Sequence, residues 1–344
     1  MDVSASSVAS HTKLCSSRKQ GITSRRQLKL LIFALYLPFT AVQIECKQQG
    51  LRQHSRKRGG MPSLRQLADE TASAPPGIAI CALVENPQED LREWVEYHKN
   101  LGVTRFYIMD SNSSKSWGRE IADYISSGLV DFFYSSDLAT KTRFPELYIY
   151  DICLTRFGSF HTWMAFLDAD EYIVLQPKTS VTSLPDFLKD YDQHGGLAIN
   201  LRIFGSSGHK TRPKGGILRN YIKCLPEQHE ENRKIKTLVN TALDPALHVH
   251  SVNHVNFKDG FFAVDEAEQR VKTGEATTPK VSMEKVAVHK YPLRLAPTST
   301  GGSGKDKALE RIAHYEALDR EATNECLAAK QAAQQNSTDK YGMR

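Results

Sequence analysis

Three carboxylates interrupt an apolar stretch near the middle of the chain. Asp168, Asp170 and Glu171 stand between the apolar runs 163–167 and 172–175. Charges placed between buried segments are costly unless a partner neutralises them. Hard divalent cations such as Mg²⁺ and Mn²⁺ take carboxylate oxygens and often share them with substrate phosphates. A solvated turn between two strands is the other interpretation, because Asp is common in turns, and the spacing alone favours neither.

Strand-length apolar runs alternate with amphipathic segments on both sides of these carboxylates. Runs without polar alternation are typical of strands that are buried on both faces of a parallel sheet. Their order predicts an α/β domain in which helices flank the sheet. The expected strands are 78–84, 103–109, 129–134, 163–168 and 196–204, with an edge strand around Leu238 and Val239, and the expected helices are 87–101, 121–125, 145–156, 181–191 and 305–334.

The composition is that of a globular protein and argues against a nucleic-acid partner. Hydrophobic residues make up 40% and charged residues 24% of the 344 residues. Residues 1–60 hold eleven of the 45 Lys and Arg but two of the 39 Asp and Glu. The remaining residues therefore hold 34 bases and 37 acids, so the net charge of +6 comes from the N-terminal part. A nucleic-acid-binding fold normally carries the basic excess itself.

The N-terminal part has the pattern of a targeting segment. A basic stretch, residues 1–29, precedes the apolar run 30–44, which is short for a membrane span of roughly 20 residues. We predict a cytosolic tail at 1–29, a signal anchor or signal peptide at 30–44 that attaches the chain to a membrane, and a stem or linker at 45–76. A transit peptide and a buried core helix are the alternatives. The fold is expected to begin at Gly77.

The six cysteines show no metal-binding spacing. No pair is arranged as Cys-x-x-Cys, so a zinc site is not expected. Cys81 and Cys153 lie within apolar segments and are expected to be small core residues. Cys224 and Cys326 could form a disulfide in an oxidising compartment.

Histidines and glycines in the second half of the chain offer further candidates. His248 and His250 alternate along a strand-like segment and therefore share one face, while His289 ends another apolar run. A lone histidine is usually structural, but two on one face favour a metal site. The Gly- and Lys-rich loop 205–216 could approach a ligand closely, although a solvated loop is the commoner explanation.

These segments together carry a family resemblance that no single one of them carries alone. The parts are Cys81–Asn86, Glu93–His98, Gly102-Val103, Phe106–Asp110, Asn112–Ser114, Phe166–Ile173, Phe204–Gly208, Lys236 and His289–Tyr291. In this order and spacing they resemble glycosyltransferase family 92 and the closely similar family-2-like group, which have the GT-A fold. The resemblance places the GT-A domain at 77–320 and leaves 321–344 as the end of the C-terminal helix and a tail.

The resemblance implies roles on the donor side of an active site. Asp168 and Asp170 match the Asp-x-Asp motif that holds Mn²⁺, or Mg²⁺, against the diphosphate of a nucleotide sugar. Glu171 is expected to bind the metal or to orient Asp170. The implied nucleotide-sugar-binding residues are Glu85, Asp110, Asn112, Asp168 and Lys236.

The resemblance also implies a histidine ligand, an acceptor loop and a base. A histidine from the C-terminal half is expected to complete the metal site, with His250 and His289 as the main candidates and His248 as a third. The acceptor loop is expected at Phe204, Gly205, Ser206 and Gly208. An inverting transfer needs a carboxylate or His within reach of the acceptor hydroxyl. The residues assigned to catalysis are Asp170, Glu171, Asp265 and Glu266, with Asp259 as a further candidate base.

We therefore expect a metal-dependent glycosyltransferase that moves a sugar from a nucleotide-sugar donor to a glycan or glycoconjugate acceptor, with inversion. One alternative is a metal-dependent nucleotidyl or phosphoryl transferase, which the lack of a P-loop pattern weakens. Another is a non-catalytic sugar-binding protein, against which the intact carboxylates argue. With the anchor, we predict a single-pass type II protein of the Golgi membrane. A secreted or endomembrane-lumen protein and an organelle-targeted protein are alternative locations.

Overall fold

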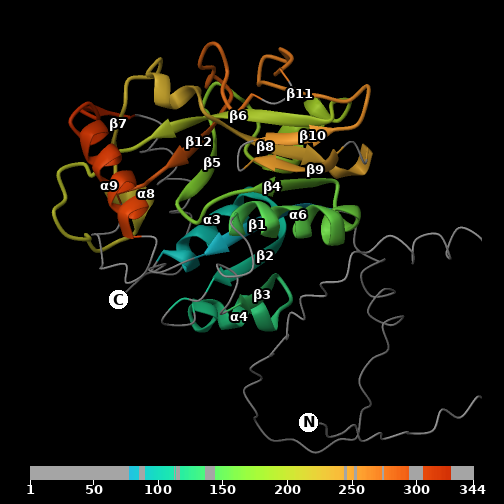
Figure 1. Cartoon of the computed structure of the whole chain (residues 1–344), viewed down its shortest axis with the longest axis horizontal. Helices are drawn as coiled ribbons and strands as arrows, with labels where there is room; N and C mark the ends of the chain where they lie inside the picture. The colour runs from blue at the N-terminus through green and yellow to red at the C-terminus, as the bar shows by residue number, and fades with distance from the viewer. Residues whose placement is uncertain are drawn as a thin grey trace, which may run out of the picture. The chain divides into compact units, whose positions relative to one another are not determined.

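The computed structural model describes residues 77–84, 90–111, 113, 117–135, 144–243, 246–251, 254–272, 275–293 and 305–326 (Figure 1). The predicted cytosolic tail, signal anchor and stem lie outside these residues. Within them, no helix combines the length and the apolar character that crossing a membrane requires.

A mixed sheet of nine strands occupies the centre of the described part (Figure 1). Its order is β3-β2-β1-β4-β8-β6-β12-β5, with β11 attached to β6. The strands are β1 (Ile78–Val84), β2 (Val103–Ser111), β3 (Val130–Ser135), β4 (Trp163–Phe166), β5 (Glu171–Leu175), β6 (Gly196–Ile203), β8 (Ile235–Asn240), β11 (Ala263–Val264) and β12 (Val286–Lys290). Two small sheets pair β9 (Ala246–Ser251) with β10 (His254–Phe257), and β7 (Lys223–Cys224) with β13 (Asn324–Glu325).

Helices cover the sheet and connect its strands. The α-helices are α3 (Leu91–Leu101), α4 (Ala122–Ser126), α6 (Pro145–Phe157), α7 (Leu184–Leu188), α8 (Ile217–Asn220) and α9 (Lys305–Asp319). Short 3₁₀ helices are η1 (Trp117–Ile121), η2 (Gly158–Phe160), η3 (Lys189–Tyr191), η4 (Glu230–Arg233) and η5 (Thr241–Leu243). Local sequence sets several helix ends. Pro145 begins α6, where its missing N–H is not needed. Gly102 ends α3 at a φ of 111°, and its N–H donates to the carbonyls of His98 and Lys99.

The packing of β1 explains why its sequence is continuously apolar. β1 lies between β2 and β4 and runs parallel to both. Ile78 and Ile80 belong to the core that includes α3, whereas Ala79 and Cys81 pack with residues of α6. Because both faces are buried, no position of the strand is left for an exposed polar residue. The expected α/β architecture, a mixed sheet flanked by helices, is confirmed.

The second half of the sheet curls back towards the first. β8 pairs antiparallel with β4 and β6, β6 pairs parallel with β12, and β12 pairs antiparallel with β5. Yet β5 follows β4 in the chain after only the turn 167–170. The path through β8, β6 and β12 therefore returns to the strand that continues β4, and side chains from these strands meet at the turn.

One expectation about a strand was wrong, and one about two cysteines was incomplete. The strand around Leu238 and Val239 is not an edge strand, because β8 lies between β4 and β6. A lysine in its sequence suggested exposure, but Lys236 is buried among carboxylates. Cys81 and Cys153 are buried as expected, yet they are not free core residues, because they form a disulfide that joins β1 to α6.

Residues 320–326 pack on the domain rather than continuing the predicted helix, and residues 327–344 lie outside the described part. α9 ends at Asp319, well before the predicted helix end. Asn324 and Glu325 then pair with β7, and a disulfide joins Cys224 to Cys326. The strand pairing and the disulfide hold residues 324–326 against β7, a position that a continued α9 would not reach.

Candidate functional site

The carboxylates follow a central strand through a turn that their own groups close. The N–H of Glu171 donates to the carbonyl of Asp168 over 3.0 Å. The N–H of Asp168 donates back to Oε2 of Glu171 over 3.0 Å. The N–H of Tyr291, just after β12, donates to the carbonyl of Asp170 over 2.9 Å. These bonds fix the backbone of the turn, so the direction of the carboxylates is set by the fold.

The three carboxylates converge. One oxygen from each of Asp168, Asp170 and Glu171 lies within 4.8 Å of the others, and no other such group of His, Cys, Asp or Glu occurs in the part of the chain that the structure describes. Glu171 is fully buried, whereas the side chains of Asp168 and Asp170 are 34% and 15% exposed. Hard oxygen ligands with partly open faces suit a divalent cation that also binds phosphate.

Two lysine ammonium groups lie against the same carboxylates. Nζ of Lys290 lies 2.7 Å from Oδ2 of Asp168, 2.8 Å from Oε1 of Glu171 and 3.6 Å from Oδ1 of Asp170. Nζ of Lys236 lies 3.0 Å from Oε2 of Glu171 and 3.5 Å from Oδ1 of Asp168. Lys290 thus contacts all three carboxylates, and Lys236 contacts two of them. Together the lysines compensate most of the negative charge.

Strand register explains why Lys290, and not its neighbour, reaches the carboxylates. In the antiparallel pair β5–β12, Lys290 is opposite Glu171 and His289 is opposite Tyr172. Directly opposite residues share a face of the sheet, and successive residues alternate. Lys290 therefore points to the carboxylate side. His289 points to the other side, where its ring lies 4.9 Å from that of Phe204.

The opposing charges shift the pKa values of the cluster. Burial alone raises the pKa of the Asp168 carboxyl, but the ammonium groups of Lys236 and Lys290 outweigh it and hold the pKa well below its usual range. Burial lowers the pKa of Lys290, and the charges of Asp168, Asp170 and Glu171 overcome it and raise the pKa well above the usual value. The lysines thus stabilise the charged form of Asp168 and are stabilised by it, whereas burial and the charge of Asp168 raise the pKa of Glu171.

Helix α6 adds two groups that the sequence analysis did not single out. The hydroxyl of Tyr150 lies 3.3 Å from Oδ1 of Asp168 and 3.3 Å from Oε1 of Glu146. Burial, and then the charge of Asp168, raise the pKa of Glu146 to about 8. The spacing of Glu146 and Tyr150, one helical turn apart and in the helix before the carboxylates, is the only signal in the sequence that could have pointed to them.

Of the residues expected to face the nucleoside, the structure describes Asp110, which lies at the carboxyl edge of the sheet. Asp110 is near the end of β2, is fully buried, and accepts a hydrogen bond from the N–H of Ser113 over 3.0 Å. Burial raises the pKa of its carboxyl. Because β1, β2 and β4 are parallel, their carboxyl ends, including the approach to Asp168, lie at the same edge. Glu85 and Asn112 lie outside the described residues.

The structure places one of the histidine candidates, His289, away from the carboxylates. His289 is fully buried on the opposite face of β12 from Lys290, and burial lowers the pKa of its ring well below the usual value. His248 and His250 belong to β9, which pairs with β10 outside the main sheet, and their side chains lie outside the described part. The strand alternation that places Lys290 at the site is therefore what keeps His289 away from it.

The candidate bases Asp265 and Glu266 have structural partners instead. The carboxylate of Glu266 is buried and accepts four hydrogen bonds, from the hydroxyl of Ser282 and the N–H groups of Glu284, Lys285 and Val286, over 2.6 to 2.9 Å. Oδ1 of Asp265 accepts from the N–H groups of Ala267 and Gln269. These bonds fix the segment that leads into β12. Asp259 is exposed.

The expected acceptor loop is held by the C-terminal helix. Phe204 is buried and stacks on Tyr291 with ring centroids 4.6 Å apart. The carboxylate of Asp319, at the end of α9, accepts from the N–H and the hydroxyl of Ser206 over 2.6 and 2.7 Å. Gly205 lies so close to Asp319 that a larger residue would clash there. Gly208 has open space around it and a φ of 86°.

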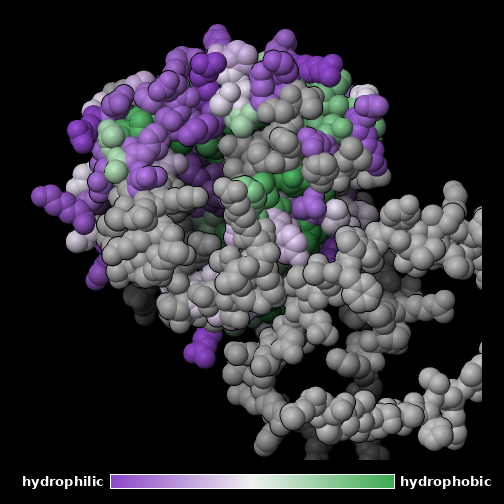
Figure 2. Space-filling model, viewed as in Figure 1, coloured by the Kyte–Doolittle hydropathy of each residue, from purple (hydrophilic) through white to green (hydrophobic). Residues whose placement is uncertain are grey.

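Arg212, a basic residue of the same loop, forms an ion pair with buried Asp90. The surface over α8, α9 and the loops near them is predominantly hydrophilic in Figure 2.

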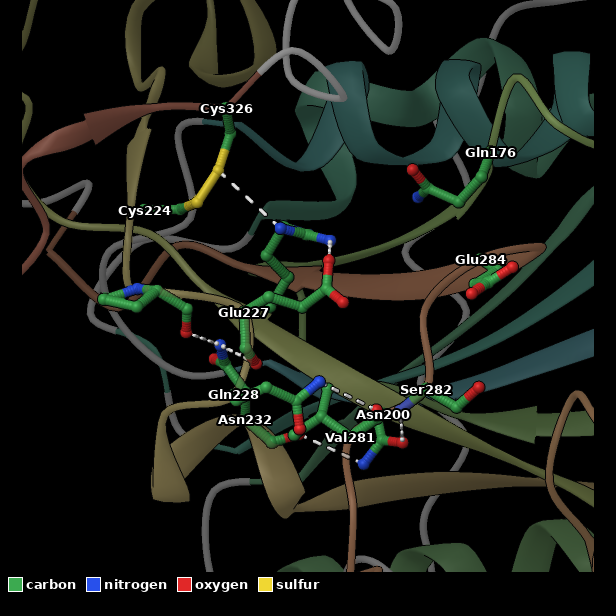
Figure 3. Close-up of polar contacts among 12 residues, drawn as sticks. Gln176, Asn200, Cys224, Glu227, Gln228, Asn232, Val281, Ser282, Glu284 and Cys326 are labelled. Carbon is green, nitrogen blue, oxygen red and sulfur yellow. Dashed lines mark hydrogen bonds and ion pairs between the residues drawn. A yellow bond between two sulfur atoms is a disulfide. The ribbon is translucent and has the colours of Figure 1, made fainter.

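A polar network next to β6 supports the C-terminal segment (Figure 3). Nη2 of Arg202 donates to Glu227 over 3.3 Å, and its Nη1 lies 3.9 Å from the sulfur of Cys326. Asn232 accepts from the N–H of Ile203 over 3.0 Å. This network, the Cys224–Cys326 disulfide and the Ser206–Asp319 pair together hold α9, whose Tyr315 interacts electrostatically with Lys290, Asp170 and Glu171.

Comparison with known proteins shows which family the sequence is similar to. The model of glycosyltransferase family 92 matches residues 77–292. A glycosyltransferase family 92 protein of Ricinus communis is 29% identical over 195 residues, which cover 54% of this chain and 33% of that protein. A galactan β-1,4-galactosyltransferase of Arabidopsis thaliana is 29% identical over 116 residues, which cover 31% of this chain and 22% of that protein. The chain thus spans about a third or less of the length of the curated relatives it matches.

Likeness to solved structures is weak. TarS of S. aureus in complex with UDP is 12% identical, the match covers 76% of this chain and 70% of that one, and the TM-score is 0.34. The match to the family model, in contrast, includes the carboxylate turn, Lys236 and Lys290, and extends over more than half of the chain. On this ground the chain belongs to glycosyltransferase family 92.

Proposed function

We propose that this chain transfers a sugar from a nucleotide-sugar donor to a glycan or glycoconjugate acceptor, in a reaction that depends on a divalent cation. The observation that carries the proposal is the convergence of Asp168, Asp170 and Glu171 at the carboxyl edge of the sheet in a member of family 92. A relative named as a galactan β-1,4-galactosyltransferase supports the choice of reaction class.

The residues present fit a divalent cation, Mn²⁺ or Mg²⁺. The donor set consists of hard carboxylate oxygens, and the partial exposure of Asp168 and Asp170 leaves space for water or phosphate oxygens to complete the coordination. Asp168 and Asp170 would hold the ion. Glu171 is fully buried and bonded to the Asp168 N–H, so its main task is to fix the turn. When bound, the cation neutralises charge on the leaving nucleoside diphosphate.

The other residues of the site bind and orient the donor. Lys236 and Lys290 supply positive charge where the diphosphate would lie, next to the carboxylates. Asp110, at the end of the parallel strand β2, accepts hydrogen bonds from the nucleoside. The loop that begins at Phe204 faces the acceptor, and Asp319 holds it in place. Inversion at the anomeric carbon is part of the proposal, on the strength of the family resemblance.

The location of the protein is also a proposal. Two disulfides form among the described residues. Disulfides persist in oxidising compartments, which supports a domain in the lumen of the endomembrane system. Attachment to the Golgi membrane through residues 30–44 is part of the proposal on the strength of the sequence pattern. Fluorescence microscopy of the tagged full chain, with a protease-protection assay for its orientation, tests this location.

Product analysis tests the reaction. The full chain is incubated with a panel of nucleotide sugars and Mn²⁺, with and without candidate glycan acceptors, and the released phosphates are identified by chromatography. We expect release of a nucleoside diphosphate with one of the donors, and loss of that release in Asp170→Asn. Release of a sugar 1-phosphate, with transfer of the nucleoside monophosphate, would instead support a nucleotidyltransferase. Binding of a sugar without any turnover would support a non-catalytic protein, and both outcomes contradict the proposal.

A further inference from the structure

The ammonium group of Lys290 occupies the point on which the carboxylates converge. It lies within 2.7 to 3.6 Å of oxygens from Asp168, Asp170 and Glu171. A divalent cation held by Asp168 and Asp170 would use the same oxygens and would lie within a few ångströms of Nζ. Two positive charges at that separation repel each other strongly in a partly buried site. The cation and the ammonium in its present position are therefore alternatives.

The charge balance of the cluster leads to the same conclusion. With Lys236 and Lys290 in place, the three carboxylates keep a single uncompensated charge. A divalent cation added to this arrangement would leave an excess of positive charge. The diphosphate of a donor brings further negative charges, and these would both attract the ammonium of Lys290 and balance the cation.

Lys290 is better placed to move than Lys236. Its side chain is 13% exposed, whereas that of Lys236 is 3% exposed. Lys290 is the last residue of β12, while Lys236 lies within β8, in the middle of the sheet. A lysine side chain is a flexible four-carbon stem, so the ammonium can turn from the carboxylates to a diphosphate without displacing the strand.

We propose that Lys290 is a built-in cation that occupies the metal position until the donor diphosphate draws it away, so that the divalent cation and the nucleoside diphosphate bind together and neither binds well alone. This inference rests on the proposed function, because it assumes a donor diphosphate at the site. It assigns Lys290 a positioning role with opposite effects on two affinities. Lys290 weakens metal binding to the free protein and strengthens binding of the diphosphate.

The test measures Mn²⁺ binding to the full chain through the electron paramagnetic resonance signal of free Mn²⁺, with and without saturating UDP. For the wild type we expect UDP to raise the Mn²⁺ affinity by about tenfold or more. In Lys290→Met we expect the affinity for Mn²⁺ alone to rise by about tenfold or more, and the effect of UDP to shrink.

Lys290→Arg keeps the charge and should keep the weak binding of Mn²⁺ alone. Lys178→Met, at an exposed lysine paired with Glu284, is the matched control and should behave as the wild type.

If the loss of the ammonium group destabilises Lys290→Met, thermal unfolding gives a second measurement of Mn²⁺ binding. Mn²⁺ alone should then raise the unfolding midpoint of Lys290→Met by more than it raises that of the wild type. The inference fails, with the proposed function intact, if the wild type binds Mn²⁺ in the presence of UDP but Lys290→Met binds Mn²⁺ alone no more tightly than the wild type does. If neither protein binds Mn²⁺ with or without UDP, the metal site itself is wrong and both proposals fall.

Discussion

Two buried glutamates in this molecule are stabilised in different ways. Glu171 is surrounded by charges, since both of its oxygens contact lysines and two further carboxylates lie beside it. Glu266 is surrounded by neutral donors, one hydroxyl and three backbone N–H groups. The first arrangement includes Lys290, a partly exposed side chain at the end of β12 that can exchange partners. The second is built into the backbone and cannot. The charged surroundings mark Glu171 as part of the candidate site, where it fixes the turn that carries Asp168, and the neutral surroundings mark Glu266 as a structural group.

The largest expected effect is at the charged cluster, where a substitution should lower activity without lowering stability. Asp170→Asn removes a ligand oxygen and one of three neighbouring negative charges. We expect the rate of sugar transfer to fall by about a thousandfold or more, while the free energy of unfolding stays the same or rises because repulsion is relieved. Steady-state kinetics and urea unfolding of the same preparation measure both. A variant that keeps activity within tenfold of the wild type, or that fails to fold, would break the comparison.

At Glu266 we expect the opposite result, a loss of stability without a loss of activity. In Glu266→Gln the side chain keeps its shape, but its amide NH₂ faces groups that are themselves donors. The free energy of unfolding should fall by about 3 kcal/mol, while the activity of the folded fraction is retained. Urea unfolding measures the loss. Glu284→Gln is the control, because Glu284 is exposed and its substitution should change stability little. If Glu266→Gln lowered the turnover of fully folded protein, Glu266 would have a part in the reaction.

A third buried group, His98, sharpens the comparison because it is neutral. With Nδ1 bonded to the carbonyl of Trp94, Nε2 accepts from the N–H of Ile173, so a proton on Nε2 would oppose that donor. Burial lowers the pKa of the ring to about 3, from its ordinary value of 6.5 in the unfolded chain. The stabilisation is therefore complete above pH 6.5 and is lost as the pH falls towards 3.

The expected size of this effect is about 2 kcal/mol between pH 7 and pH 5. Chemical unfolding of the wild type and of His98→Gln at both pH values measures it, since the variant lacks this titration. We expect the stability difference between the two proteins to shrink by that amount at the lower pH. A difference that does not change with pH would mean that the pKa of His98 is not lowered in the folded protein.

The smallest effect is expected where an ion pair is neither buried nor part of a cluster. Arg92 pairs with Asp123 over 2.5 Å, but both side chains are largely exposed, at 43% and 58%. Water and salt screen such pairs. Arg92→Met should change the free energy of unfolding by no more than about 0.5 kcal/mol. The same urea titration measures the change. If Arg92→Met lowered the free energy of unfolding as much as Glu266→Gln does, exposure would not predict how much an ion pair contributes to the stability of this protein.

Sequence reasoning was most successful where local pattern decides structure. β1 occupies the predicted segment, because a strand buried on both faces has a continuous apolar sequence. Asp168, Asp170 and Glu171 were identified because charges between apolar runs are unusual. Lys290 was missed because its place depends on the register of β12 against β5, which lies far away in the sequence. The disulfide of Cys81 and Cys153 was missed for the same reason, since 72 residues separate the partners.

The central claim is that Asp168 and Asp170 hold a divalent cation against a nucleoside diphosphate. Calorimetric titration of UDP into the full chain, once with Mn²⁺ and once with a chelator, tests it most directly. The account predicts binding in Mn²⁺ that weakens by about tenfold or more in the chelator, and no effect of Mn²⁺ in Asp168→Asn/Asp170→Asn. Equal affinity for UDP with Mn²⁺ and with the chelator in the wild type would contradict it.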